Sequence, residues 1–91
     1  MVGDEKIEEE LRRRIKKDIE IFHTNIKPFA AASFGADVDR IVRLSRMYAS
    51  DSASYLEKGD LPTAFSCISY AHGLLDAVRD LQGKRLEKPL E

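Results

Sequence analysis

The chain has 91 residues, enough for one domain with a modest hydrophobic core. Its 15 basic and 16 acidic side chains give a net charge of -1, so the overall charge does not favour nucleic acid or an anionic membrane as a partner. A single cysteine excludes an internal disulfide and suits a reducing compartment. Because neither a signal peptide nor an apolar run of about 18 residues is found, we expect a cytoplasmic protein that does not enter a membrane.

A first amphipathic helix is predicted over residues 5–26, where apolar residues recur at steps of three and four. The apolar stripe consists of Ile7, Leu11, Ile15, Ile19, Phe22 and Ile26. Asp4 is expected to cap this helix, after a loose end at residues 1–3. Glu8–Glu10 stand four residues before Arg12–Arg14, which predicts three ion pairs along the helix.

The segment from Lys27 to Ala36 connects the first two helices. Pro28 disfavours helical geometry at Lys27, so the first helix is expected to end there. Phe29 and Phe34 are too apolar for a free loop, and we expect them to fold back over one end of the molecule, with a helical turn between them. The alternative is an exposed apolar patch that a partner protein binds, which makes these two residues the candidate interaction surface.

A second helix is predicted over residues 37–58, with Asp37 as its cap. Its apolar surface begins with Val38, Ile41, Val42, Leu44 and Met47, while Asp39, Arg40, Arg43 and Arg46 are expected to face water. Gly59 should end the helix in the left-handed conformation, and Asp60 should cap the next one.

A third helix is predicted over residues 61–82, with Pro62 in its first turn. Its apolar stripe consists of Ala64, Ile68, Ala71, Leu75 and Val78. Because the turn before it is very short, this helix must run antiparallel to the second. Gly73 predicts a close contact with a neighbouring element, and Gly83 is expected to end the helix.

These elements predict an all-α, antiparallel, up-and-down three-helix bundle. It forms a single domain over residues 4–83, followed by a flexible tail over residues 84–91.

The run YLEKGDLPTAFSCISYAHGLLDA, residues 55–77, resembles a family of short archaeal proteins known as domain of unknown function 357. The similarity extends from the first helix to about Gly83. The resemblance implies a small three-helix bundle from an archaeon with no established activity, and it supplies no functional residues.

A candidate polar cluster lies on the predicted hairpin and consists of Asp51, Tyr55, Tyr70, His72 and Asp76. His72 and Asp76 stand four residues apart, so the carboxylate could orient the imidazole for general-base chemistry. This is the hypothesis of an enzymatic or small-ligand site around Tyr70, His72 and Asp76. We favour the structural interpretation, in which His72 and Asp76 pair at the margin of the core, or Asp76 engages Arg79 or Arg46. We therefore assign no catalytic residue.

The sequence predicts neither a metal site nor a cofactor site. Cys67, His72 and His23 are too few and too widely spaced for structural zinc, and no glycine-rich phosphate loop occurs.

The basic run Arg12–Lys17 suggests a second hypothesis, nucleic-acid binding. The preceding glutamates and the lack of interleaved aromatic residues disfavour it. The sequence therefore favours a non-enzymatic protein-interaction or accessory module that self-associates or binds a partner protein.

Overall fold

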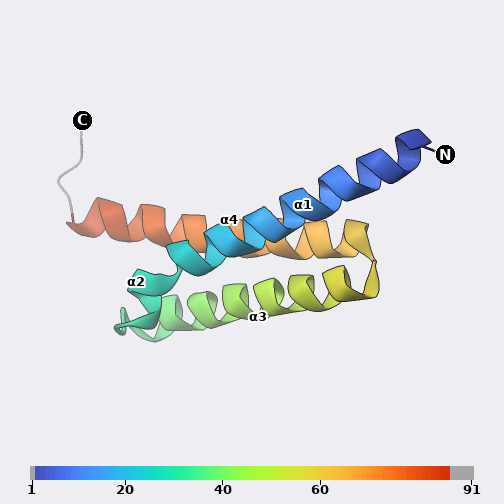
Figure 1. Ribbon diagram of the computed structural model, residues 1–91. Coiled ribbons are helices and arrows are strands. Elements are labelled where there is room, and N and C mark those ends of the chain that lie inside the picture. The colour runs from blue at the N-terminus through green and yellow to red at the C-terminus, as the bar shows by residue number, and fades with distance from the viewer. Residues whose placement is uncertain (1, 87–91) are drawn as a thin grey trace.

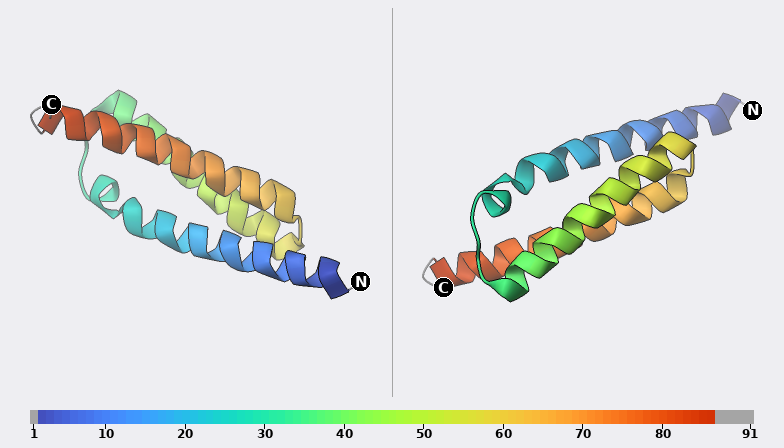
Figure 2. Two further views of the ribbon diagram at one scale, coloured as in Figure 1. Left: turned by 90° about the horizontal axis from the view of Figure 1, so that it is seen from above. Right: turned by 90° about the horizontal axis from the view of Figure 1, so that it is seen from below.

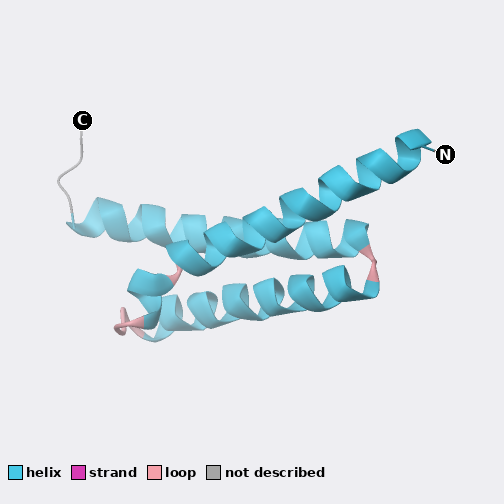
Figure 3. Cartoon of the chain, viewed as in Figure 1, coloured by secondary structure: helices cyan, strands magenta, loops and turns pink. Residues whose placement is uncertain are grey.

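The computed structural model describes the backbone of residues 2–86 and the side chains of residues 3–83, and the described chain is all-α (Figures 1 and 3). Its helices are α1 (Val2–Asn25), α2 (Lys27–Ala30), α3 (Ala36–Lys58) and α4 (Leu61–Leu86). The all-α prediction is confirmed. The prediction of three helices differs from the structure, because the connection between the first two long helices folds into the one-turn helix α2. None of the helices within residues 2–86 has the length and apolar character needed to cross a membrane.

Helices α3 and α4 form an antiparallel hairpin, and α1 lies across one side of it (Figures 1 and 2). The molecule is elongated, with extents of 53 × 28 × 16 Å. In every view the first turns of α1 project past the end of the hairpin, beyond the turn that joins α3 to α4.

The turn between α3 and α4 forms as its sequence predicts. Gly59 adopts a φ of 85°, a left-handed conformation that glycine reaches without steric cost, and its N–H donates to the carbonyl of Leu56 at 3.1 Å. The carboxylate of Asp60 accepts from the N–H of Thr63 at 3.3 Å, as an N-cap does. The two predicted caps are therefore confirmed.

The core lies between the three long helices. Its buried apolar residues are Ile15, Phe22, Ile26, Val42, Ala49, Leu56, Leu61, Ala64, Ile68, Ala71, Leu75 and Val78. Two fully buried serines accompany them on α3. Ser52 Oγ donates to the carbonyl oxygen of Ala64 on α4 at 2.7 Å, whereas Ser45 Oγ donates within its own helix to Val42 at 2.7 Å. Small residues at this seam allow the close approach that the Ser52 hydrogen bond requires.

Three predicted helix ends are wrong. Helix α1 begins at Val2, so Asp4 lies in its first turn and residues 2 and 3 are helical. The N-cap position of α3 is Gly35 and not Asp37. Helix α4 continues through Gly83 to Leu86, because one glycine costs a helix only about 1 kcal/mol and the residues around it propagate the helix. Of the predicted tail, residues 84–86 therefore belong to α4, and residues 87–91 lie outside the described residues.

The predicted close contact at Gly73 is also wrong. A Cβ built at this position meets no atom within 4 Å, and the residue is exposed. The glycine is therefore not needed for packing among the described residues.

The predicted apolar stripe of α1 is only partly buried. Ile15, Phe22 and Ile26 lie in the core, whereas Ile7 is 64% exposed. Ile7 belongs to the start of α1, where residues 3–10 are all exposed.

The predicted ion pairs along α1 do not form. Among residues 3–83, ion pairs join Arg40 to Asp37 at 3.7 Å and Arg79 to Asp76 at 3.5 Å, and none joins Glu8–Glu10 to Arg12–Arg14. Exposed helical pairs of this kind contribute only about 0.3–0.5 kcal/mol, too little to hold long side chains in place. Arg12 instead donates to the carbonyl of Leu56 at 3.3 Å and ties α1 to the end of α3.

Candidate functional site

The connection between α1 and α3 folds back over one end of the core. Pro28 lies in the first turn of α2, and the amides of Phe29 and Ala30 donate to the carbonyl of Ile26 at 2.9 and 3.0 Å. Phe29 packs against the core, and Phe34 rests against Phe29 with their ring centroids 5.2 Å apart. Both rings are half-buried, as the fold-back interpretation predicts.

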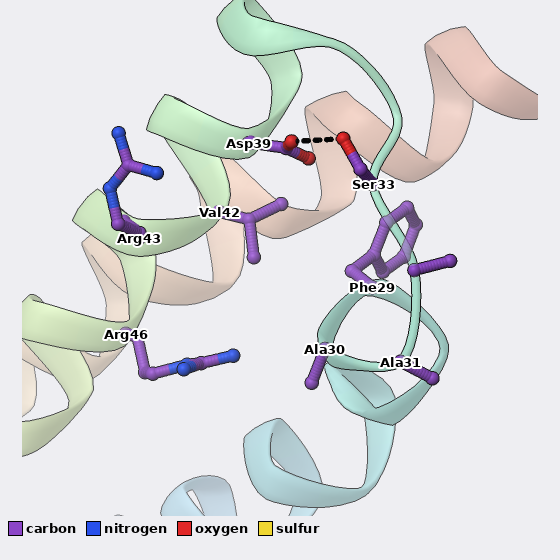
Figure 4. A pocket seen from close by; sticks show the side chains of 9 residues that line it. Phe29, Ala30, Ala31, Ser33, Asp39, Val42, Arg43 and Arg46 are labelled. Atoms are coloured by element: carbon purple, nitrogen blue, oxygen red, sulfur yellow. Dashed lines mark hydrogen bonds between the residues drawn. The ribbon is translucent and has the colours of Figure 1, made fainter.

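Asp39 holds this segment against the start of α3. Its carboxylate accepts from the amide of Phe34 at 3.0 Å and from the hydroxyl of Ser33 at 2.5 Å (Figure 4). The Phe34 amide and then the Ser33 hydroxyl hold the pKa of Asp39 below its usual value, and the nearby Arg43 lowers it further. Gly35, with a φ of 104°, makes the sharp bend that lets Asp39 reach back. Asp39 therefore holds the loop against α3 through two hydrogen bonds, whereas the sequence predicted that it faces water.

A cavity of about 350 Å³ opens between α2, the following loop and α3 (Figure 4). Its lining residues are Phe29, Ala30, Ala31, Ala32, Ser33, Asp39, Val42, Arg43 and Arg46. Val42, which is buried, points into the cavity, and the side chain of Arg46 extends from α3 toward α2. The accessible lining of this open cavity is more polar than apolar, with Val42 and Phe29 as its large apolar side chains and the guanidinium group of Arg46 beside them.

Arg43 lies close enough to Asp39 to lower its pKa further. Among residues 3–83, however, neither Arg43 nor Arg46 forms an ion pair or a hydrogen bond of its own. The carboxylate in the cavity wall, Asp39, already accepts from Ser33 and Phe34. An arginine beside an apolar surface suits a ligand that combines a carboxylate with an apolar group, because guanidinium matches carboxylate geometry in two parallel hydrogen bonds.

The polar cluster predicted on the hairpin divides between two sides of α4. The ring of Tyr70 packs edge-on against Tyr48 of α3, with centroids 4.6 Å apart. His72 faces α1 instead, where its Nε2 lies 2.8 Å from the carbonyl oxygen of Asp18 and its ring packs edge-on against Phe22 at 5.7 Å. Tyr70 and His72 therefore contact different helices.

The other members of the cluster have neighbours of their own. Asp76 pairs with Arg79 at 3.5 Å on the exposed surface, as the structural interpretation proposed. The ammonium of Lys58 lies 5.4 Å from the ring centroid of Tyr55. Burial raises the pKa of the Cys67 thiol, and the carboxylates of Asp51 and Asp60 raise it further, which opposes thiolate formation.

Helix α1 carries two basic depressions over the run Arg12–Lys17. One, of about 220 Å³, is lined by Glu9, Arg12, Arg13 and Lys16. The other, of about 430 Å³, is lined by Glu10, Arg13, Arg14, Lys17 and Asp18. Carboxylates line both, so this surface is mixed in charge rather than uniformly basic. Among the described residues, no group of three or more His, Cys, Asp or Glu side chains is arranged to hold a metal ion.

Sequence reasoning assigned Arg43 and Arg46 to a water-facing surface and so missed the cavity. Their spacing of three residues places them on one side of α3. The hydrogen bonds of Asp39 with Ser33 and Phe34 hold the loop against this side of α3, and hydrophobic periodicity does not predict such contacts.

Comparison with protein families gives one match. The model of the family described as "Protein of unknown function (DUF357)" matches residues 13–83, which include the second half of α1, the cavity and nearly all of the hairpin. A search of curated proteins finds no match.

Proposed function

This chain belongs to the DUF357 family of proteins of unknown function, and from its geometry we propose that it acts as a non-enzymatic interaction module. The three long helices serve as a small bundle scaffold, and the binding site is the cavity between α2 and α3. The occupant is an acidic segment of a partner protein that also presents an apolar side chain.

The observation that carries this proposal is the position of Arg46. Its guanidinium extends toward α2 across an open, largely polar cavity that Val42 and Phe29 also line, and it has no ion-pair partner among residues 3–83. Arginine and aromatic residues are enriched at the hot spots of protein interfaces, the few residues that carry most of the binding energy. A partner carboxylate would pair with Arg46 while its apolar neighbour covers Val42.

The chemistry of the site supports binding rather than catalysis. Ser33 donates its hydroxyl hydrogen to Asp39, but the lowered pKa of Asp39 makes this carboxylate a weak base for activating a nucleophile. The lining side chains contain neither histidine nor cysteine. The contacts that can form there are ion pairs, hydrogen bonds and apolar packing.

The proposal is tested with two short helical peptides of matched length, one built from Glu and Leu and the other from Lys and Leu. Titration into isotope-labelled protein, followed by amide chemical shifts, should show that the acidic peptide moves the signals of Phe29–Phe34 and Val42. Arg46→Gln should weaken this binding by about tenfold, equal to about 1.4 kcal/mol. Arg13→Gln, a matched loss of an exposed arginine on α1, should leave it unchanged.

Equal affinity for the basic peptide, or shifts centred on other elements, would contradict the proposal. Since Arg46 is exposed, Arg46→Gln should unfold at the same temperature as the unaltered protein. That comparison separates a lost contact from a lost fold.

A further inference from the structure

The projecting turns of α1 form an acidic surface around one exposed apolar side chain. Residues 4–10 contain five acidic side chains and one basic one. Ile7, at their centre, is 64% exposed, the highest value among the large apolar side chains that are exposed. Asp4 and Glu8 lie within one turn of Ile7, so carboxylates flank it. All of these residues are exposed, and the N-terminal end of α1 extends past the hairpin (Figures 1 and 2).

Helix α3 carries a surface of the opposite charge. A depression of about 270 Å³ is lined by Arg40, Ile41, Arg43, Leu44 and Met47. Leu44 is 37% exposed and Met47 is 61% exposed, although both were expected in an apolar helix face. The depression is therefore apolar at its centre and bordered by arginines, and it adjoins the cavity between α2 and α3, with which it shares Arg43.

The two surfaces cannot meet within one molecule. The N-terminal end of α1 projects past the turn between α3 and α4, whereas the depression lies on the first half of α3, toward the opposite end of a molecule 53 Å long. A second copy in antiparallel orientation would bring them together. The acidic end of each copy would then meet the arginines of the other.

We propose that two copies of this chain associate antiparallel, each inserting Ile7 into the Ile41–Leu44–Met47 depression of the other. Two-fold symmetry makes the two contacts identical and closes the assembly as a dimer. The side chain of an isoleucine fits a depression of about 270 Å³. Carboxylates around Ile7 meet Arg40 and Arg43, which orients the copies and disfavours a parallel pairing. This inference does not rest on the proposed function, because Ile41, Leu44 and Met47 do not line the cavity beside Arg46, although Arg43 borders both.

Sedimentation velocity from about 1 μM to about 1 mM protein tests the inference, and we expect a monomer–dimer equilibrium within that range. Ile7→Ser should weaken the dimer by at least about tenfold. Ile21→Ser is the matched control, because Ile21 is 40% exposed on the same helix but lies away from the projecting turns. It should leave the dimer unchanged.

Charge reversal gives a test that does not depend on apolar contacts. The double variants Asp4→Lys/Glu8→Lys and Arg40→Glu/Arg43→Glu should each be monomeric, because like charges then face each other in both contacts. An equal mixture of the two should form a heterodimer, because one contact is then unaltered and the other is reversed on both sides.

The inference is overturned if the unaltered protein is monomeric throughout this range, if Ile7→Ser and Ile21→Ser behave alike, or if the mixture of reversed variants stays monomeric. Circular dichroism of each variant establishes that it is folded. Arg46→Gln should retain the dimer, so failure of this inference and failure of the proposed function give different results.

Discussion

The Nε2 atom of His72 lies 2.8 Å from the carbonyl oxygen of Asp18 and joins α4 to α1. A carbonyl oxygen can only accept, so Nε2 must carry the proton and donate it. The same ring packs edge-on against Phe22, which is fully buried. With its Nε2 proton committed to a helix carbonyl, His72 positions α1 on the hairpin.

Replacing His72 with alanine should lower the free energy of unfolding by about 1–2 kcal/mol, the sum of one partly buried hydrogen bond and one aromatic edge contact. Urea denaturation measures this loss. Asp76→Ala is the control and should change stability by less than about 0.5 kcal/mol, because the ion pair between Asp76 and Arg79 is exposed. Equal losses in the two variants would contradict the assignment of His72 to the α1 contact.

The two buried serines of α3 should respond differently to alanine. Ser52→Ala removes the hydrogen bond to Ala64 on the neighbouring helix and should lower stability by about 1 kcal/mol. Ser45→Ala removes a bond within α3 only, and the better helix propensity of alanine should keep the change within about 0.5 kcal/mol. Thermal unfolding of both variants measures the difference, and the reverse order would refute it.

Two glycines should respond to alanine with opposite signs. Gly73→Ala should raise stability by about 1 kcal/mol, because Gly73 is inside α4 and its Cβ position is open. Gly59→Ala should lower stability by about 1–2 kcal/mol, because a φ of 85° strains any side chain. Chemical denaturation tests both. A destabilised Gly73→Ala variant would reveal a contact that this structure does not contain.

Asp39 should make stability depend on pH in the acidic range. The pKa of Asp39 is lower in the folded chain than in the unfolded chain, so the unfolded chain binds a proton more readily. Asp39 therefore contributes to the free energy of unfolding above about pH 4, and this contribution is lost as the pH falls through the pKa of the folded state. Asp39→Asn should therefore be less stable than the unaltered protein at neutral pH, and the gap should close in acid. Urea midpoints across the pH range measure the gap. A gap that stays constant with pH would show that Asp39 contributes by shape alone.

The run Arg12–Lys17 should not retain the protein on a polyanion column at about 0.15 M salt, because Glu9, Glu10 and Asp18 line the same depressions. Removing those three charges with Glu9→Gln, Glu10→Gln and Asp18→Asn should increase the salt needed for elution. Tight retention of the unaltered protein would restore the nucleic-acid hypothesis.

The α3–α4 hairpin could be predicted from the sequence because the residues that determine its turn act on the backbone next to them. Gly59, Asp60 and Pro62 each impose a backbone or capping preference that the neighbouring residues do not oppose. Gly83 sends a weaker signal, since a helix can absorb one glycine, and α4 runs through it.

The candidate sites depend on contacts between distant segments, and the sequence predicts them less well. Helical spacing places Ile7 in the apolar stripe of α1, but it does not show whether another helix covers that turn, and Ile7 is in fact exposed. The spacing that pairs His72 with Asp76 does not reveal that the imidazole reaches a carbonyl 54 residues away. The position of Arg46 beside a cavity likewise follows from the fold of the α2 loop.

The very short turn at Gly59 also bears on how the chain folds. Helices α3 and α4 are close in sequence and contact each other far more extensively than either contacts α1. Pairing them closes only a small loop of chain, which costs little entropy and is fast. The hairpin should therefore assemble first, with α1 settling onto it afterwards. In native-state hydrogen exchange, the amides of α1 should lose protection before those of the hairpin.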